Sequence, residues 1–127
     1  MTDLIIPRSV ITIGREVLQP HFPGVKIASR APKDWPARFI RFSRVGGPKE
    51  WALDRPFVLV ECFASTEAGG RDSEQAEADA LLAYTVLESA PGPVLYFEGG
   101  PISELDDPDR SSHARFQFTG TIGVGIS

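Results

Sequence analysis

The stretch of sequence that decides the fold is PFVLVECFAS, residues 56–65. β-branched and aromatic residues fill it, and a glycine pair lies on either side of it, so it predicts a β-strand bounded by turns. One face of this strand would carry Phe57, Leu59 and Phe63, and the other face is apolar as well. Because burying a large apolar side chain is worth roughly 1.5–3 kcal/mol, both faces of the strand should find cover.

Hydrophobic periodicity on either side of this strand predicts the other elements. Helices are expected over residues 7–18 and, after an N-cap at Asp72, up to the proline at position 91. The expected strands cover 25–29, 38–45, 56–65, 94–98 and 113–126, and a polar loop covers 99–112. The order α-β-β-β-α-β-β indicates a single α+β domain over residues 1–127, a mainly antiparallel sheet of about five strands with two helices packed on it.

The second helix has the clearest amphipathic signal. Asp72 is a favourable N-cap, and Gln75 stands three residues later, as in a capping box. The apolar stripe at helical spacing comprises Ala78, Leu81, Leu82, Val86 and Leu87. Two helices cover only about one face of such a sheet, so the second face would be covered by loops or by another subunit. Periodicity alone leaves these two possibilities open.

The last expected strand alternates between an apolar and a polar face. Phe116 and Phe118 point one way, whereas Arg115 and Gln117 point the other. This pattern predicts a strand with one wet face.

The composition is that of one ordinary globular domain. With 127 residues, 42% of them hydrophobic, the chain can bury a core without a disulfide or metal staple. It has no run of about 18 apolar residues and no secretory signal, so we expect a protein made and used in a cytoplasm. The single cysteine, Cys62, excludes an intrachain disulfide and agrees with that compartment.

Charge is divided unevenly along the chain. The formal net charge of −4 argues against general nucleic-acid binding. Residues 1–55 contain ten Lys and Arg against five Asp and Glu, whereas residues 56–127 contain three against twelve. A chain polarised in this way can present faces of opposite sign, unless folding interleaves its two halves.

The candidate nucleophile is Cys62, with His21 or His113 as its base. Cys62 stands in mid-strand among valines, however, where a small buried hydrophobic residue is the usual occupant. Two isolated histidines without nearby cysteines do not form a metal site. We therefore expect no catalytic, metal or cofactor site.

Three further features are interpreted structurally. The acidic loop at 104–109 offers oxygens for calcium but lacks the spacing of an EF-hand loop, which favours a solvated loop. The glycine pairs lack phosphate-loop spacing and are interpreted as turns. Arg38, Arg41 and Arg44 have the chemistry to bind phosphate, but their scatter along a strand favours interface or surface charges.

Taken in order, several segments resemble those of a known family. They are PARFIRFSRVGGP (36–48), Trp51, DRP (54–56), VECFA (60–64), an Ala- and Leu-rich helix, GGP (99–101), DPD (107–109) and ARFQFT (114–119). This pattern is similar to that of the tail terminator proteins of long-tailed phages, especially phages of actinobacteria. The likeness runs from Val25 onward, and over 1–24 only the helix placement agrees. The end of the chain, GVGIS, departs from the arginine-bearing strand that closes many relatives.

The resemblance implies a structural virion protein and not an enzyme. Tail terminators form a ring, usually of six subunits, at the head-proximal end of the tail tube, where they end tube polymerisation and join the tail to the head. The implied partners are further copies of the chain, the tail tube protein and head–tail connector proteins. Genomic DNA would pass through the ring without specific binding, and no membrane is involved. The implied location is the virion tail, after assembly in the host cytoplasm, with subunit contacts covering the second sheet face.

We expect the subunit or partner interface around the second strand and the acidic loop, at Arg41, Arg44, Gly46, Gly47, Trp51, Arg55 and Asp107. Complementary charge between the two halves of the chain would orient a head-to-tail contact. Alternatively, these charges pair within one subunit or keep the surface soluble.

Two other functions stay open. One is another neck component, such as a head–tail connector or tail completion protein. The other, from a different class, is a small hydrolase or ligand-binding module that uses Cys62 or a pocket beneath the third strand.

Overall fold

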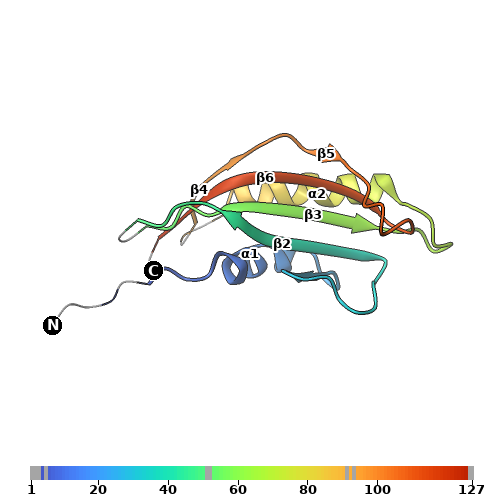
Figure 1. The fold of residues 1–127 in the computed structure, drawn as a ribbon, viewed down its shortest axis with the longest axis horizontal. Helices are drawn as coiled ribbons and strands as arrows, with labels where there is room; N and C mark the ends of the chain where they lie inside the picture. Colours follow the sequence, from blue (N-terminus) through green and yellow to red (C-terminus); the bar gives the residue numbers. More distant parts are fainter. Residues whose placement is uncertain (1–3, 5, 51–52, 91, 93, 126–127) are drawn as a thin grey trace.

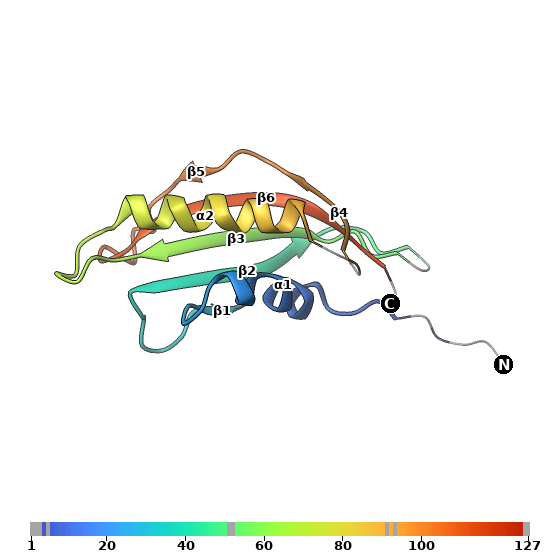
Figure 2. The ribbon, with the colours of Figure 1, turned by 180° about the vertical axis from the view of Figure 1, so that it is seen from behind.

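The computed structural model describes residues 4, 6–50, 53–90, 92 and 94–125 and shows an α+β fold. A six-stranded sheet carries both helices on one face, and the opposite face, named here the open face, has no helix on it (Figures 1 and 2). The elements in chain order are α1 (Val10–Leu18), the 3-10 helix η1 (Gln19–His21), β1 (Lys26–Ala28), β2 (Arg38–Gly46), β3 (Phe57–Ala64), α2 (Ser73–Glu88), β4 (Val94–Gly99), β5 (Ser103–Glu104) and β6 (Ala114–Val124). None of the described helices is long and apolar enough to cross a membrane.

The sheet is mixed, with strand order β1-β2-β3-β6-β4, and β5 also pairs with β6. β3, the quoted stretch, pairs antiparallel with β2 on one side and with β6 on the other. β1 departs from the expected antiparallel arrangement and pairs parallel with β2. A parallel neighbour usually requires a long crossover. Since β1 is only three residues, or about 10 Å, long, the connection at 29–37 can return along it.

The expected polar loop over residues 99–112 in fact begins as an edge strand. β4 pairs with the end of β6, and after a short break β5 pairs with its first half at Phe116 and Gln117. Between them the Gly100 amide donates to the Thr119 carbonyl at 2.8 Å, so the ladder is hardly interrupted. The sheet therefore has six strands rather than five. β5 was missed because it is only two residues long and both of them are polar.

α2 begins as expected, with the Asp72 carboxylate accepting from the Gln75 amide at 3.1 Å. Its expected apolar stripe is wrong in part, because Leu81 and Leu82 are 51% and 39% exposed and Ala78 is exposed too. The buried face of α2 is instead made of Ala76, Asp79, Ala80, Ala83, Val86 and Leu87. Small alanines let the helix approach the sheet closely, and this rotation leaves the two leucines outside.

The main core lies between the helices and the sheet. Alternate residues of the central strands point into it, among them Phe42, Val60 and Phe118, each no more than 1% exposed. α1 begins at Val10, after the N-cap Ser9, three residues later than the sequence predicted. Gly14 of α1 lies directly against the Phe42 ring, so a Cβ at position 14 would overlap the ring. Glycine weakens an isolated helix, but the close packing of α1 on Phe42 requires it at position 14.

Replacing Gly14 with alanine should therefore destabilise the protein. At an exposed helix position this change stabilises by roughly 0.5–1 kcal/mol, whereas overpacking against Phe42 should cost about 1–3 kcal/mol. Urea denaturation of Gly14→Ala, Phe42→Leu and the double variant measures this. The double variant should lose less than the sum of the two single losses, because leucine leaves room for the added methyl group. A stabilised Gly14→Ala protein would contradict the packing of α1.

Candidate subunit interface

One end of the open face is covered by two loops of the chain itself. Trp35, from the β1–β2 connection, packs on Phe39 and Phe63 with ring centroids 5.6 and 4.8 Å away. The Arg110 guanidinium lies 4.2 Å from the Trp35 ring centroid. His113 Nε2 lies 2.8 Å from the carbonyl oxygen of residue 36, which ties together the loops that precede β6 and β2. Intramolecular contacts therefore cover this end.

The middle of the open face holds an ion-pair network. The Glu61 carboxylate of β3, which is 2% exposed, accepts from Arg41 of β2 at 2.6 and 2.8 Å and from Arg115 of β6 at 3.0 Å. Asp107 lies 4.0 Å from the same Arg115 nitrogen. Two arginines and two carboxylates therefore balance formally. Asp107 brings the acidic loop to this row, and the Leu105 carbonyl of the same loop accepts from Arg115 Nε at 2.6 Å. The network ties the three adjacent strands β2, β3 and β6 together.

The Glu61 carboxylate accepts two hydrogen bonds from Arg41 and so favours the charged form of this arginine. These hydrogen bonds raise the pKa of the Arg41 guanidinium, the opposing effect of burial is smaller, and the charges of Glu61 and Asp107 add to the increase. Arg41 is therefore paired within its own chain.

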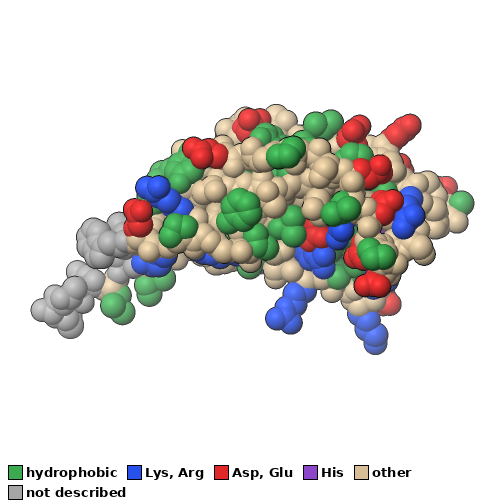
Figure 3. Space-filling view, turned by 45° about the horizontal axis from the view of Figure 1, so that its top comes forward, with side chains coloured by type: hydrophobic (Ala, Val, Ile, Leu, Met, Phe, Trp, Pro, Cys, Tyr) green, Lys and Arg blue, Asp and Glu red, His purple; other side chains and the backbone are tan. Residues whose placement is uncertain are grey.

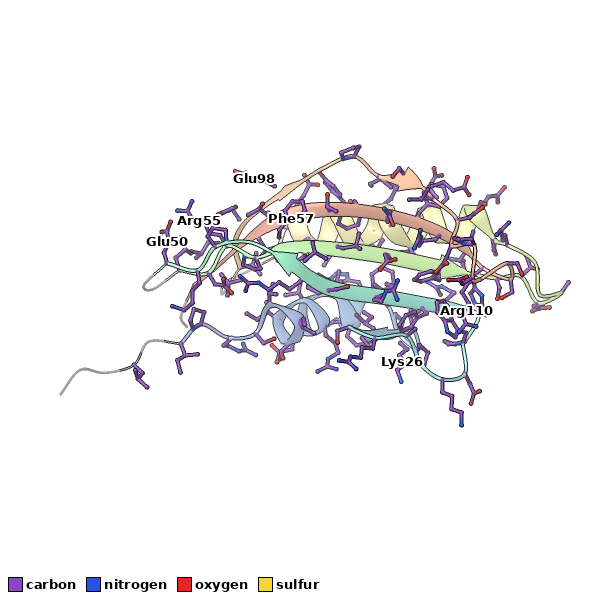
Figure 4. All side chains as sticks on the ribbon, viewed as in Figure 1. Lys26, Glu50, Arg55, Phe57, Glu98 and Arg110 are labelled. Carbon is purple, nitrogen blue, oxygen red and sulfur yellow. The ribbon has the colours of Figure 1, made fainter. Side chains whose placement is uncertain are left out.

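The other end of the open face is apolar and exposed. Phe57 of β3 is 39% exposed and Val45 of β2 is 51% exposed, and half-buried Leu59 shares a strand face with Phe57 (Figure 4). We name these three residues the apolar patch. The exposed pair Arg55 and Glu50, whose charged atoms are 3.7 Å apart, lies at its rim.

The β2–β3 hairpin extends beyond this patch and is held by Arg44. Arg44 donates to the Asp54 carboxylate at 2.9 Å, to the Gly47 carbonyl at 2.8 Å and to the Gly46 carbonyl at 3.0 Å. Both glycines have positive φ, 143° and 97°, and a Cβ on Gly47 would overlap the backbone of Arg55. The glycine pair is not the expected turn. Gly46 ends β2 at a register shift opposite Phe57 and pairing resumes between Lys49 and Asp54, so the pair forms a bulge within the hairpin, and Arg44 fixes its shape.

The predicted interface residues fall into two places. The hairpin holds Arg44, Gly46, Gly47 and Arg55. The ion network holds Arg41 and Asp107, about 13 Å away along β3. Trp51 lies outside the described residues.

Sequence reasoning missed Glu61 and Arg115, which complete the network. The signal for Glu61 is a charge inside a strand of apolar residues, but its partners depend on the strand register. The three strand arginines are each held by two hydrogen bonds to one carboxylate of the same chain: Arg38 to Asp79, Arg41 to Glu61 and Arg44 to Asp54. This pairing favours the alternative in which these charges act within one subunit.

The candidate nucleophile Cys62 is not placed beside a base. It is fully buried on the helix side of the sheet, and burial raises the pKa of its thiol well above the usual range. His113 packs on Trp35 on the open face, and His21 lies exposed in η1. In the acidic loop, Asp106 lies 3.6 Å from Arg71. The described residues include no group of three or more His, Cys, Asp or Glu placed to hold a metal ion.

A groove of about 700 Å³ lies between α1 and α2, away from β3. Ile13, Val17 and Leu82 contribute apolar walls, and an ion pair between Arg8 and Glu16, at 2.7 Å, lies on its lining. This groove is not the pocket beneath the third strand that the ligand-binding alternative would use, since beneath β3 lie the buried alanines of α2.

Removing the Glu61 carboxylate should be strongly destabilising. Glu61→Ala leaves Arg41 and Arg115 half-buried without their shared partner, and we expect a loss of about 3–5 kcal/mol in the free energy of unfolding. The matched control is Glu98→Ala on exposed β4, which should change it by less than about 0.5 kcal/mol. Equal losses for the two variants in urea denaturation would show that the network does not bind the strands together.

Cys62 should be inert in the native protein. Its burial and the raised pKa of its thiol predict that iodoacetamide alkylates the folded chain about a thousandfold or more slowly than the urea-unfolded chain. Cys62→Ala should cost about 1 kcal/mol in stability. Mass spectrometry of timed samples measures the modification. Complete alkylation of folded protein within minutes would revive the nucleophile hypothesis.

The open face thus presents an apolar patch and a projecting hairpin beside a closed ion network. Comparison with known proteins adds no relative, since no protein-family model matches the chain and no curated protein matches it significantly.

Proposed function

We propose that this chain is a structural phage protein that forms a ring on the head-proximal end of the tail tube, ends tube polymerisation and joins tail to head. The resemblance of its sequence to tail terminators suggests this role. The structural observation that carries the proposal is the apolar patch, which the described residues leave exposed on the open face.

The patch is suited to a protein partner. Its residues sit on the rigid central strands, and charged Arg55 and Glu50 rim it, which is the arrangement of an interface with an apolar centre. A stable interface covers about 800 Å² on each partner, more than three side chains supply. The contact would therefore extend onto the hairpin, where Arg44, Gly46 and Gly47 shape the backbone.

The arginines of β2 fit a ring through which DNA slides. A lining of free arginines would bind phosphates, since each neutralised phosphate strengthens binding. Arg38, Arg41 and Arg44 are instead held by carboxylates of the same chain. In the proposed ring these residues shape the protein surface and leave DNA unbound. The same features suit a connector or tail completion protein.

The groove between α1 and α2 supports a second candidate, a small ligand-binding module. Its volume lies within the range of small-molecule sites. A thermal-shift screen with apolar fragments tests this function, and enlarging Val17 to Trp should abolish any shift found, whereas Phe57→Asp should not.

Introducing a charge into the apolar patch should block capping. Phe57→Asp should fold, because Phe57 is already 39% exposed, but it would place an unpaired charge in the proposed contact. We expect tails assembled with it to be overlong and not joined to heads, as measured by electron microscopy of tail lengths. The matched control is Leu82→Asp, which is 39% exposed like Phe57 but lines the groove side of α2, and it should cap normally. Normal capping by a folded Phe57→Asp protein would remove the support for the proposal.

A further inference from the structure

The two edges of the sheet carry opposite charge. At one edge lie Lys26 of β1 and, in the connection that follows it, Arg30 and Lys33; we name these three residues the basic edge. At the other edge lie Glu98 of β4 and Glu104 of β5, together with two glutamates of α2. We name this second group the acidic edge: Glu77, Glu88, Glu98 and Glu104.

Strand order places the two edges as far apart as the sheet allows. β1 is the first strand of the sheet and β4 the last, with β2, β3 and β6 between them. Figure 4 labels Lys26 and Glu98 on opposite sides of the sheet, and Figure 3 shows acidic side chains along the β4–β5 side. The charges at the two edges thus keep the sign of their half of the sequence, whereas in the middle of the sheet the two halves interleave, with Arg41 paired to Glu61.

The α2 glutamates belong to the acidic edge because of how α2 sits. Tyr84 packs on Phe97 of β4 with ring centroids 5.1 Å apart. Glu77 and Glu88 stand seven residues before and four after Tyr84, so they lie on the same side of the helix. At the start of α2 the hydroxyl of residue 73 donates to Glu104 at 2.6 Å, which joins the helix to β5.

These edge charges, unlike the arginines of β2, have no opposite partner within the described part of the chain. The ion pairs there include none of the three residues of the basic edge and none of the four of the acidic edge. All seven residues are exposed. Asp34 is the one carboxylate in the β1–β2 connection, and it leaves that edge net positive.

We propose that the basic edge of one copy docks on the acidic edge of a second copy. Each copy then uses one edge for each neighbour, and such a head-to-tail contact closes into a ring if its rotation allows. Complementary charge orients the contact and prevents an edge from pairing with its own kind. Lys26 alone could simply protect an exposed edge strand against unwanted pairing with another strand. That protection does not require the acidic edge on the opposite side of the sheet. Only the closure into a ring rests on the proposed function.

Charge exchange between the edges tests the contact. The basic-edge variant carries Lys26→Glu, Arg30→Glu and Lys33→Glu, so both of its edges are acidic. The acidic-edge variant carries Glu77→Lys, Glu98→Lys and Glu104→Lys, so both of its edges are basic. Each variant alone should lose self-association and tail capping, because its edges repel. An equimolar mixture should regain association and capping, since copies of the two kinds alternate.

The control separates edge recognition from general attraction. Three Glu→Lys changes away from the edges, at Glu16, Glu50 and Glu67, raise the formal charge from −4 to +2, as the acidic-edge variant does. Sedimentation velocity should show association of the two edge variants at least about tenfold tighter than that of the basic-edge variant with this control. The association of the two edge variants should also weaken about tenfold when the salt concentration rises from about 50 to about 500 mM.

Carbodiimide coupling identifies the residues that meet in the wild-type chain. In a mixture of isotope-labelled and unlabelled protein, amide cross-links between copies should join Lys26 or Lys33 to the acidic edge, and none should start from Lys49.

The inference is overturned if the mixture of edge variants neither associates nor caps tails, or if the control associates equally well. Its failure is distinct from that of the proposed function. Edge association without any capping by the wild-type chain would refute the tail role alone. Loss of capping by Phe57→Asp, with no rescue by the mixed edge variants, would refute the edge contact alone.

Discussion

The burial of one carboxylate governs the arrangement of the open face. Glu61 sits in the central strand, and its charge is tolerated only because Arg41 and Arg115 reach it from the strands on either side. This pairing fixes the neighbours of β3 and, together with the acidic loop that reaches Arg115 through Leu105 and Asp107, closes the middle of the sheet face. The apolar side chains around Phe57 are left beyond it. The exposed patch is therefore a consequence of where the ion network ends.

Much of the fold could be predicted from the sequence because the strands alternate strongly. β3 and β6 begin and end within two residues of their expected positions over the described part of the chain. The expected wet face of β6 is wrong, because its polar residues are half-buried rather than exposed: Arg115, Gln117, Thr119 and Thr121. β5 could not be predicted, since two polar residues become a strand only because β6 lies beside them. The buried face of α2 was predicted wrongly because leucine is more hydrophobic than alanine, so the leucines were expected to point into the core. Packing distance favoured Ala76, Ala80 and Ala83 instead.

The candidate interface was predictable in part. The burial of Cys62 follows from local sequence. The glycine pair at 46–47 was expected to be a turn but forms a bulge, because the two strands pair again beyond it. The partners of the arginines do not, because they depend on strand register and on contacts between distant elements, such as Arg38 with Asp79 of α2. The charge split was visible in the sequence, but only the structure shows, for the described residues, that the arginines of β2 are paired and that the charges at the two sheet edges are not.

We propose that the subunit has separate surfaces: the apolar patch with the hairpin for a protein partner, and the two oppositely charged edges for neighbouring copies. An image of purified phage tails carrying this chain, reconstructed by cryo-electron microscopy, tests the account most directly. We predict a closed ring of copies at one end of the tube, with Lys26 of each copy facing Glu98 of the next. A single copy per tail, or copies spread along the tube, would contradict it.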